Sequence, residues 1–300
     1  MNPIFDYSKA FARNIGWVTR EEQSILQRKR IAIAGMGGVG GIHLLTLARL
    51  GIGAFTISDL DVFELINFNR QAGAMMSTLN QSKVETLAHL AKEINPDLDI
   101  RIFPKGVNED NVENFLLGAD LYIDGMDFFS FDTRELLFAN CYRLKIPATT
   151  VAPLGMGAAL LNFLPGGMSF EDYFCWKGQT EEEKSLRFLL GLSPARLQFH
   201  YLVDHSAINF KEKRGPSTVM ACQLCAAIAG TEALKILLGR GKVLSAPRGI
   251  QFDMFRNKYV HTWRPGGNRH PLQKLALIFA RMKLSSLKKK ASPAESINVM

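Results

Sequence analysis

The 300-residue sequence is long enough for one large domain or two closely joined ones, and its 47% hydrophobic and 21% charged residues are typical of a globular protein. Four cysteines are too few for a disulfide framework, and the amino-terminal residues lack the basic start and apolar core of a secretory signal. The composition therefore excludes a disulfide-stapled secreted domain and predicts a cytoplasmic protein.

The net charge of +8 is concentrated at the carboxyl-terminal end. Residues 256–300 hold ten of the 36 Lys and Arg residues but one of the 28 Asp and Glu residues, so their charge is +9 and the rest of the chain is at −1. A nearly neutral body does not favour nucleic acid binding, which usually needs a basic surface.

The first half of the chain alternates predicted strands and helices after an amino-terminal helical arm at residues 1–28. A capping-box pattern at Ser82 and Glu85 and the stop at Pro96 define one of the helices. Strands are predicted at 29–35, 54–59, 99–106, 120–126 and 147–154, and helices at 40–51, 82–95, 111–117 and 131–144. This alternation predicts a nucleotide-binding Rossmann-like region over 29–155.

The second half changes pattern but contains no linker or repeat. It predicts a strand at 157–165, a helix at 180–192, no clear period at 194–216, a long apolar helix at 219–238 and a hairpin at 249–265. We therefore expect one α/β, doubly wound Rossmann-like sheet, parallel in the first half and extended by partly antiparallel strands from the second. Residues 156–268 would form a substrate and dimerisation half, followed by a basic amphipathic tail over 269–300.

Gly35, Gly37 and Gly40 form the pattern GxGxxG between the first predicted strand and helix, and Gly38 lies in the same turn. In this context glycines let the backbone approach a phosphate group, and the amino end of the helix supplies oriented N–H donors. The pattern predicts a nucleotide site.

Two acidic residues, Asp59 and Asp61, end the second predicted strand. Asp59 lies where a dinucleotide enzyme binds the ribose hydroxyls, so an NAD-dependent oxidoreductase remains an alternative. The polar residues that follow are not needed by such an enzyme: Asn67, Arg70, Gln71 and Lys83. A triphosphate does need them, because its roughly four negative charges must be spread over Arg, Lys, helix amino ends and Mg²⁺.

Asp124 and Asp127 follow the fourth predicted strand, at the sheet edge where α/β proteins bind ligands. Mg²⁺ bound with phosphates usually takes one or two protein carboxylates. Asp127, farther out in the loop, is the candidate metal ligand, and Asp124 is expected to cap a turn.

The combination "GMGGVG", "DLDVFELINFNRQ", "SKVE" and "DGMD" resembles the ThiF/MoeB/HesA family, bacterial relatives of ubiquitin-activating enzymes. The resemblance covers residues 8–155 well and continues loosely through 219–238. It implies ATP- and Mg²⁺-dependent adenylylation of a carboxylate, with release of pyrophosphate. The substrate would be the carboxyl-terminal glycine of a small carrier or ubiquitin-like protein, or a small-molecule acid.

The resemblance also implies roles for individual residues. Asp61 would bind the ribose hydroxyls, and Asp127 would bind Mg²⁺. Asn67, Arg70 and Lys83 would bind the phosphates, with Gln71 in the same group. Arg13 would enter the site of a partner subunit, which implies a homodimer and makes Arg13, Arg70, Lys83 and Asp127 the candidate catalytic residues.

The sequence departs from the family at two places. Phe128 follows Asp127 where the family usually has Asn, and the four zinc cysteines of many relatives are not present as two pairs, so no zinc is expected. Cys222 and Cys225 lie in an apolar helix and are interpreted as packing residues, whereas Cys175 beside Lys177 is the one candidate for an acyl-carrying thiol.

The tail places Leu275, Ile278, Phe279 and Met282 at helical spacing ahead of three lysines. It is interpreted as a docked terminal helix, with contact to a membrane surface as an alternative. The functional alternatives are a tRNA threonylcarbamoyladenosine dehydratase, with tRNA possible but not favoured as partner, and the oxidoreductase.

Overall fold

An eight-stranded sheet in the order β3-β2-β1-β4-β5-β6-β7-β8 runs through the protein in this computed structural model, which describes residues 4–209 and 212–291 except for the side chains of 205 and 286–291. The first five strands are parallel and the last three antiparallel, which confirms the predicted fold. The strands are β1 (Arg30–Ala34), β2 (Ala54–Ser58), β3 (Asp99–Phe103), β4 (Leu121–Asp124), β5 (Ala148–Leu154), β6 (Gly157–Phe163), β7 (Arg248–Asp253) and β8 (Lys258–Trp263).

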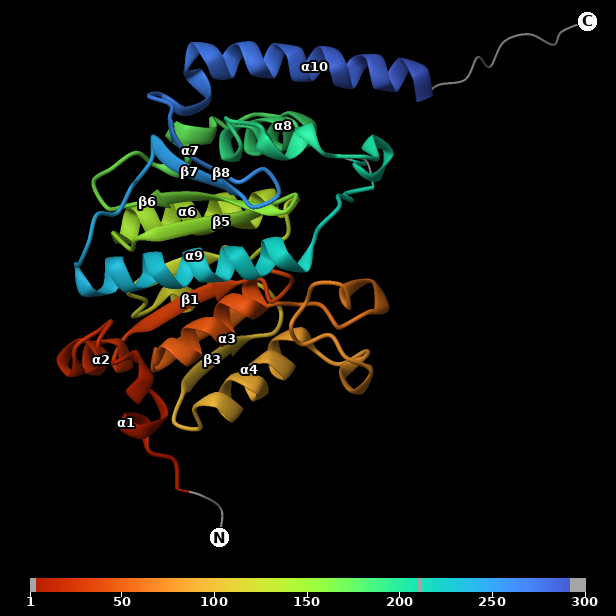
Figure 1. Cartoon of the computed structure of the whole chain (residues 1–300). Helices are drawn as coiled ribbons and strands as arrows, with labels where there is room; N and C mark the ends of the chain where they lie inside the picture. The colour runs from red at the N-terminus through yellow and green to blue at the C-terminus, as the bar shows by residue number, and fades with distance from the viewer. Residues whose placement is uncertain (1–3, 210–211, 292–300) are drawn as a thin grey trace, which may run out of the picture.

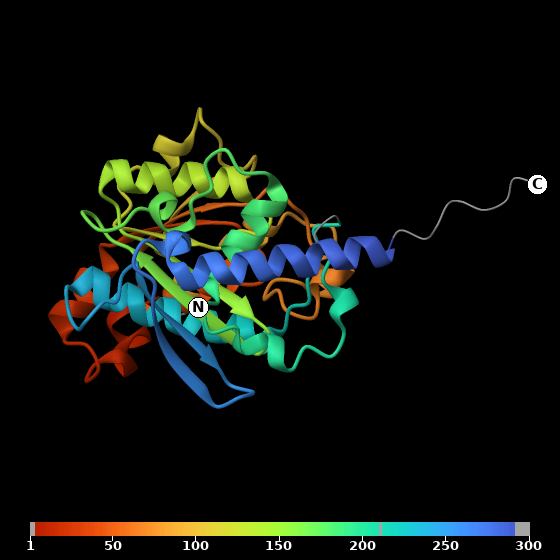
Figure 2. The same cartoon turned by 90° about the horizontal axis from the view of Figure 1, so that it is seen from above.

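Helices cover both faces of the sheet (Figures 1 and 2). One face carries α3 (Gly40–Leu50), α4 (Lys83–Ile94) and α9 (Val219–Leu238). The other carries α5 (Val112–Leu116), α6 (Phe131–Leu144), α7 (Phe170–Phe174) and α8 (Glu181–Leu192). Because both faces of the central strands are covered, β1 and β4 are buried along their whole length and their sequences are almost entirely apolar.

The capping residues act as the sequence predicts. Gly51 ends α3 in the left-handed conformation at φ 90°, where a side chain would be strained. Ser82 caps α4 by accepting a hydrogen bond from the Glu85 amide at 3.4 Å. These local signals fix where α3 ends and where α4 begins.

The apolar helix α9 lies across the parallel strands and against α3 (Figure 1). Within the described residues it is the helix whose length and hydropathy would also allow a membrane span. Its contacts with α3, β5 and β6 account for that composition, because a helix packed between such elements is a core helix.

A cluster of aromatic rings fills the space between the sheet and α6 to α8. Phe138 and Phe170 stack with ring centroids 4.4 Å apart, and Phe170 also meets Trp176 at 4.8 Å. Phe170 belongs to α7, a five-residue helix that the sequence analysis missed. These rings attach the second half of the chain to the Rossmann-like half.

The amino-terminal segment, with α1 (Tyr7–Ala10), the 3₁₀ turn η1 (Ala12–Asn14) and α2 (Arg20–Gln27), packs on the carboxyl end of α3. The Tyr7 hydroxyl donates to the Gly51 carbonyl at 2.5 Å, and Asn14 Nδ2 donates to the Leu50 carbonyl at 3.2 Å. This segment therefore lies at the end of α3 opposite the glycine turn.

The last helix, α10 (Pro271–Ala291), docks on α8 and forms the outermost layer of the molecule (Figure 1). The predicted docked helix is present. However, Leu277 makes the contact, whereas the four apolar residues singled out in the sequence are exposed. The apolar surface of α8 determines which face of α10 is buried. The spacing of apolar residues within α10 alone does not predict that face.

Candidate active site

The glycine turn is built by direct contact between backbones at the carboxyl ends of β1 and β4. Gly35 has φ 87°, and a Cβ on it would overlap backbone atoms of Gly125. A Cβ on Gly40 would overlap backbone atoms of Gly35. Gly125, which follows β4, was not among the predicted site residues. The glycines at 35 and 40 are thus required for packing, while Gly37 and Gly38 face the side chains of the next loop.

Asp59 lies against this turn. Its Oδ2 accepts a hydrogen bond from the Met36 amide at 2.6 Å, and its Oδ1 accepts one from the Asp61 amide at 2.8 Å. Burial raises the pKa of Asp59, and the two amides and the Lys83 ammonium oppose that shift. The carboxylate is therefore held in position at the edge of the turn.

Asp61 is instead paired with Lys83. The Lys83 ammonium lies 3.0 Å from Asp61 Oδ2, and the Lys83 side chain is 7% exposed against 58% for Asp61. Lys83 is also the first residue of α4, so its charge adds to the positive end of that helix. A buried cation with one exposed carboxylate partner is suited to meeting a second anion.

The loop after β2 folds back through a 3₁₀ turn, η2 (Leu65–Asn67), onto the glycine turn. Asn67 Oδ1 accepts from the Glu64 amide at 2.9 Å, and the Asn67 carbonyl accepts from the amides of Arg70 at 3.1 Å and Gln71 at 2.9 Å. Asn67 therefore shapes the turn that carries the next two residues.

Arg70 and Gln71 pack over the glycine turn. A Cβ on Gly38 would lie 3.4 Å from Arg70 Cγ, and one on Gly37 would lie 3.7 Å from Gln71 Nε2. Arg70 Nη1 donates to Asn69 Oδ1 at 2.8 Å and to the Ile66 carbonyl at 3.1 Å. The buried Gln71 Oε1 has no hydrogen-bond partner, which is unfavourable unless a bound molecule completes it.

Asp124 and Asp127 have different environments. Asp124 is buried and paired with Arg134, whose Nε lies 2.8 Å from Asp124 Oδ2, and its Oδ1 caps the turn at the Met126 amide. Arg134 also donates to the carbonyls of residues 126, 127, 128 and 130. The exposed Asp127 accepts from the Phe129 amide at 3.0 Å. Arg134, which the sequence analysis did not select, thus holds the loop that presents Asp127.

A hollow of about 470 Å³ lies beside the first turns of α9, lined by Met156, Met220, Gln223, Leu224, Met254 and Phe255. Cys222, between Met220 and Gln223, contacts the glycine turn, since its Sγ would be 3.1 Å from a Cβ on Gly38. Asn69 Nδ2 donates to the Ser217 carbonyl at 3.1 Å, which ties the loop after β2 to the start of α9. At about 100° per residue, Met220 and Leu224 lie about 160° around α9 from Cys222. The hollow is therefore at the same end of α9 as the glycine turn but on the opposite face of the helix, and it is formed by the second half of the chain.

Arg13 is not part of this group. It is exposed in η1, at the opposite end of α3 from the glycine turn. An 11-residue helix is about 16 Å long, so the Arg13 side chain cannot reach the site of its own chain.

The cysteines are also dispersed. Cys222 and Cys225 are buried in α9, and the half-exposed Cys175 accepts a hydrogen bond from Arg269 Nε at 3.3 Å, a neighbour that the sequence did not indicate. Among the residues with a described placement, no three His, Cys, Asp or Glu side chains are grouped as a metal site would require.

The chain belongs to the ThiF family, whose model matches residues 11–275, as the motifs predicted. It is 33% identical over 156 residues to the tRNA threonylcarbamoyladenosine dehydratase of Haemophilus influenzae (52% of this chain, 59% of that protein). It is 31% identical over 143 residues to the molybdopterin-synthase adenylyltransferase of Salmonella typhimurium (48% and 57%). The matched part thus spans little more than half the length of these relatives.

The fold is shared with solved structures. The crystal structure of the E. coli tRNA N6-threonylcarbamoyladenosine dehydratase in complex with AMP aligns with a TM-score of 0.59 at 22% identity, covering 80% of this chain and 98% of that one.

The Asp124–Arg134 pair supplies a test of how the Asp127 loop is held. Asp124→Ala leaves a buried guanidinium without its carboxylate and should lower the free energy of unfolding by about 3–5 kcal/mol, measured by urea denaturation. Asp132→Ala removes the exposed partner of Lys184 and should cost less than about 1 kcal/mol. Equal losses in the two variants would contradict this role of the pair.

Proposed function

We propose that this protein uses ATP and Mg²⁺ to adenylylate a carboxylate, releasing pyrophosphate. The observation that carries the proposal is the packing of Arg70 and Gln71 over the glycine turn, with an unpaired Gln71 oxygen. The family membership and the AMP complex of a protein with the same fold agree with it.

Asp59 is the better candidate for the ribose hydroxyls. Its carboxylate lies on the glycine turn through the Met36 amide, whereas the Asp61 carboxylate is engaged by Lys83. In this assignment Asp61 orients the Lys83 ammonium toward the phosphates. The resemblance to the family assigned ribose binding to Asp61. The hydrogen bonds described above favour Asp59 for this role instead.

The phosphates would be bound by Arg70, Lys83, Asn67 and the amino end of α3. Arg70 can make two parallel hydrogen bonds to phosphate oxygens, and Lys83 adds a point charge at the start of α4. Asp127 would hold Mg²⁺, which would neutralise charge on the phosphates when bound. Phe128, which occupies the position of the usual family Asn, packs on Phe188 with centroids 5.2 Å apart and supplies no polar contact through its ring.

In the reaction a substrate carboxylate oxygen forms a bond to the α-phosphorus of ATP while the bond from that phosphorus to the bridging oxygen breaks. Pyrophosphate leaves with the electron pair, and no proton needs to be transferred. The residues named above act by positioning and by stabilising the charge that develops on the departing group. The hollow beside α9 would receive a part of the substrate distant from the reacting carboxylate, which assigns a binding role to residues 156–268.

Titration calorimetry with ATP and Mg²⁺ tests this nucleotide site. Arg70→Ala and Asp127→Ala should each weaken ATP binding about tenfold or more, because each removes a charged contact to the phosphates or their cation. The matched controls are Arg49→Ala, at the far end of α3, and Asp97→Ala, in the loop before β3, both exposed. Binding of NAD in place of ATP, unchanged in all four variants, would instead support an oxidoreductase.

We further propose a homodimer in which Arg13 completes the site of the other copy. Arg13 is exposed on a segment tied to the distal end of α3, so it can reach a glycine turn only in a second chain. A site shared between two copies can be restored by mixing two different inactive variants.

A mixture of Arg13→Ala and Arg70→Ala chains, refolded together, tests this sharing. Each variant alone should lack high-affinity ATP sites, whereas random pairing should restore about a quarter of the wild-type number, because half of the dimers contain one intact site. Calorimetric stoichiometry measures this fraction. No recovery in the mixture, or full binding by the Arg13→Ala protein, would exclude a contribution in trans.

A tRNA substrate is the second candidate, favoured by the dehydratase relatives and by the basic carboxyl-terminal end. ATP–pyrophosphate exchange separates the candidates. A carrier protein ending in glycine should stimulate exchange with little dependence on salt between about 50 and 200 mM, whereas tRNA binding weakens steeply over that range. Stimulation by tRNA alone, lost at the higher salt, would replace the carrier by tRNA as the substrate.

A further inference from the structure

The helix α10 has two apolar faces. Leu277 is 2% exposed and packs on Leu186 and Leu190 of α8, and Gln273 Nε2 donates to the Leu190 carbonyl at 2.9 Å. Arg281 Nε binds Glu183 Oε2 at 3.0 Å on the same helix. These contacts fix α10 on the body of the protein.

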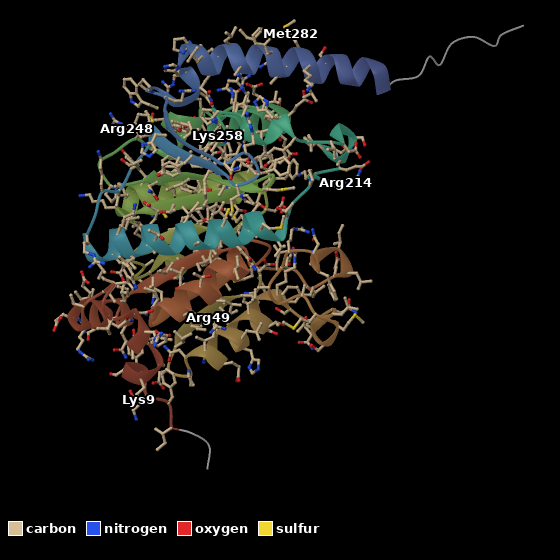
Figure 3. The ribbon with its side chains drawn as sticks, in the orientation of Figure 1. Lys9, Arg49, Arg214, Arg248, Lys258 and Met282 are labelled. Carbon is tan, nitrogen blue, oxygen red and sulfur yellow. The ribbon has the colours of Figure 1, made fainter. Side chains whose placement is uncertain are left out.

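The other face points away from the body. Its side chains, each 49–63% exposed, are Leu272, Leu275, Ile278, Phe279 and Met282, which we call the outer stripe. At about 100° per residue, Leu275 and Phe279 lie about 160° around the helix from Leu277, on either side of the opposite face. Figure 3 shows Met282 on the side of α10 that faces away from the rest of the chain.

We propose that the outer stripe inserts into the surface of an anionic lipid bilayer and attaches the protein peripherally to a membrane. A helix with Phe and Leu along one face and basic residues beside it binds in the interfacial plane by burying the apolar face among the headgroups. The docked face of α10 is already satisfied by α8, so this binding requires no rearrangement of the fold.

The charges around the stripe match an anionic surface. Lys274 and Lys283 are exposed on α10, each about 40° around the helix from a residue of the outer stripe, whereas Arg281 is paired with Glu183. The chain from residue 256 onward has a net charge of +9. Each Lys or Arg near an anionic membrane contributes about 1 kcal/mol of attraction at moderate ionic strength. The stripe and these charges therefore act together on one surface.

Other occupants fit the stripe less well. A second copy packed stripe against stripe would bring two basic helices together, and like charges across such a contact are repulsive. A nucleic acid would leave the apolar side chains facing phosphates and water. A bilayer satisfies the apolar residues and the charges at once.

The position of α10 agrees with this attachment. The helix is an outermost element, and its long axis is exposed along one side of the molecule (Figures 1 and 2). The loop after β2, which carries Arg70, is separated from α10 by the body of the sheet in Figure 1. Attachment through the outer stripe thus leaves the candidate active site accessible.

Vesicle flotation of the full chain tests the proposal. The wild type should float with vesicles of about 30% phosphatidylglycerol in phosphatidylcholine and not with phosphatidylcholine alone. The triple variant Leu275→Ser, Phe279→Ser, Met282→Ser should bind at least about tenfold more weakly, because the buried apolar area is lost. The matched control changes Leu117, Tyr259 and Trp263, which are 58–61% exposed elsewhere, to Ser and should float like the wild type.

The charge contribution is measured with Lys274→Glu, Lys283→Glu, which should lower binding by at least about thirtyfold, because two attractive charges of about 1 kcal/mol each are lost. Phe279→Trp gives a second readout: brominated lipids should quench its fluorescence beyond the quenching seen in the wild type. ATP binding by every variant checks that the chain is folded, since none of these residues belongs to the nucleotide site.

Three results would overturn the proposal. The wild type does not float with anionic vesicles, the triple variant floats as well as the control, or the fluorescence added by Phe279→Trp is not quenched. If the wild type does not bind vesicles and the triple variant changes oligomeric state, the outer stripe is a contact to a second copy. If the wild type does not bind vesicles and the triple variant loses tRNA binding, the outer stripe is a contact to nucleic acid.

Discussion

The contact among Gly35, Gly40 and Gly125 is the constraint on which the site depends. Three backbone segments meet where β1 and β4 end, and a Cβ on any of these glycines would overlap the neighbouring backbone. This contact sets the start of α3 and the point at which the chain leaves β4. The loop after β2 then folds onto the glycine turn, and the loop after β4 is fixed by Arg134 next to it. Side chains from four segments are thereby held around one small region of backbone.

The sheet separates three proposed functional regions in space. Its carboxyl edge carries the candidate nucleotide site, and the added antiparallel strands and α9 form the hollow on the outer face of α9. The amino-terminal segment lies at the far end of α3, where Arg13 is out of reach of its own site. The outermost helix α10 uses one face for folding and leaves another uncovered. The proposed catalytic site, the proposed contact to a second copy and the proposed contact to a membrane surface therefore lie on separate parts of the molecule.

Local patterns in the sequence predicted most of the fold. The helices α6 and α9 begin and end at the predicted residues. For α9, an apolar stretch of helical length coincides with clear end signals, because Thr218 caps its start and Gly239 ends it in the left-handed conformation. Helix α7 was missed because five residues are too few to establish a period. The family was also predictable, since its signals lie in short continuous motifs.

Contacts between distant residues were not predictable in the same way. Asp59 and Asp61 are chemically identical and two residues apart, and only their partners, the Met36 amide and the Lys83 ammonium, distinguish them. Arg134 follows Asp124 by ten residues, and the turn that brings them together has no sequence period. In α10, apolar residues recur on both faces, so α8 alone decides which face is buried.

The most direct test of the central claim is a crystal structure of the full-length protein with Mg²⁺ and a non-hydrolysable ATP analogue. The account predicts ribose hydroxyls at Asp59, phosphates at Arg70 and Lys83, Mg²⁺ at Asp127, and Arg13 of a second copy at the phosphates. A nucleotide bound elsewhere, or a structure in which Arg70 and Lys83 do not contact it, would contradict the proposed adenylylation site.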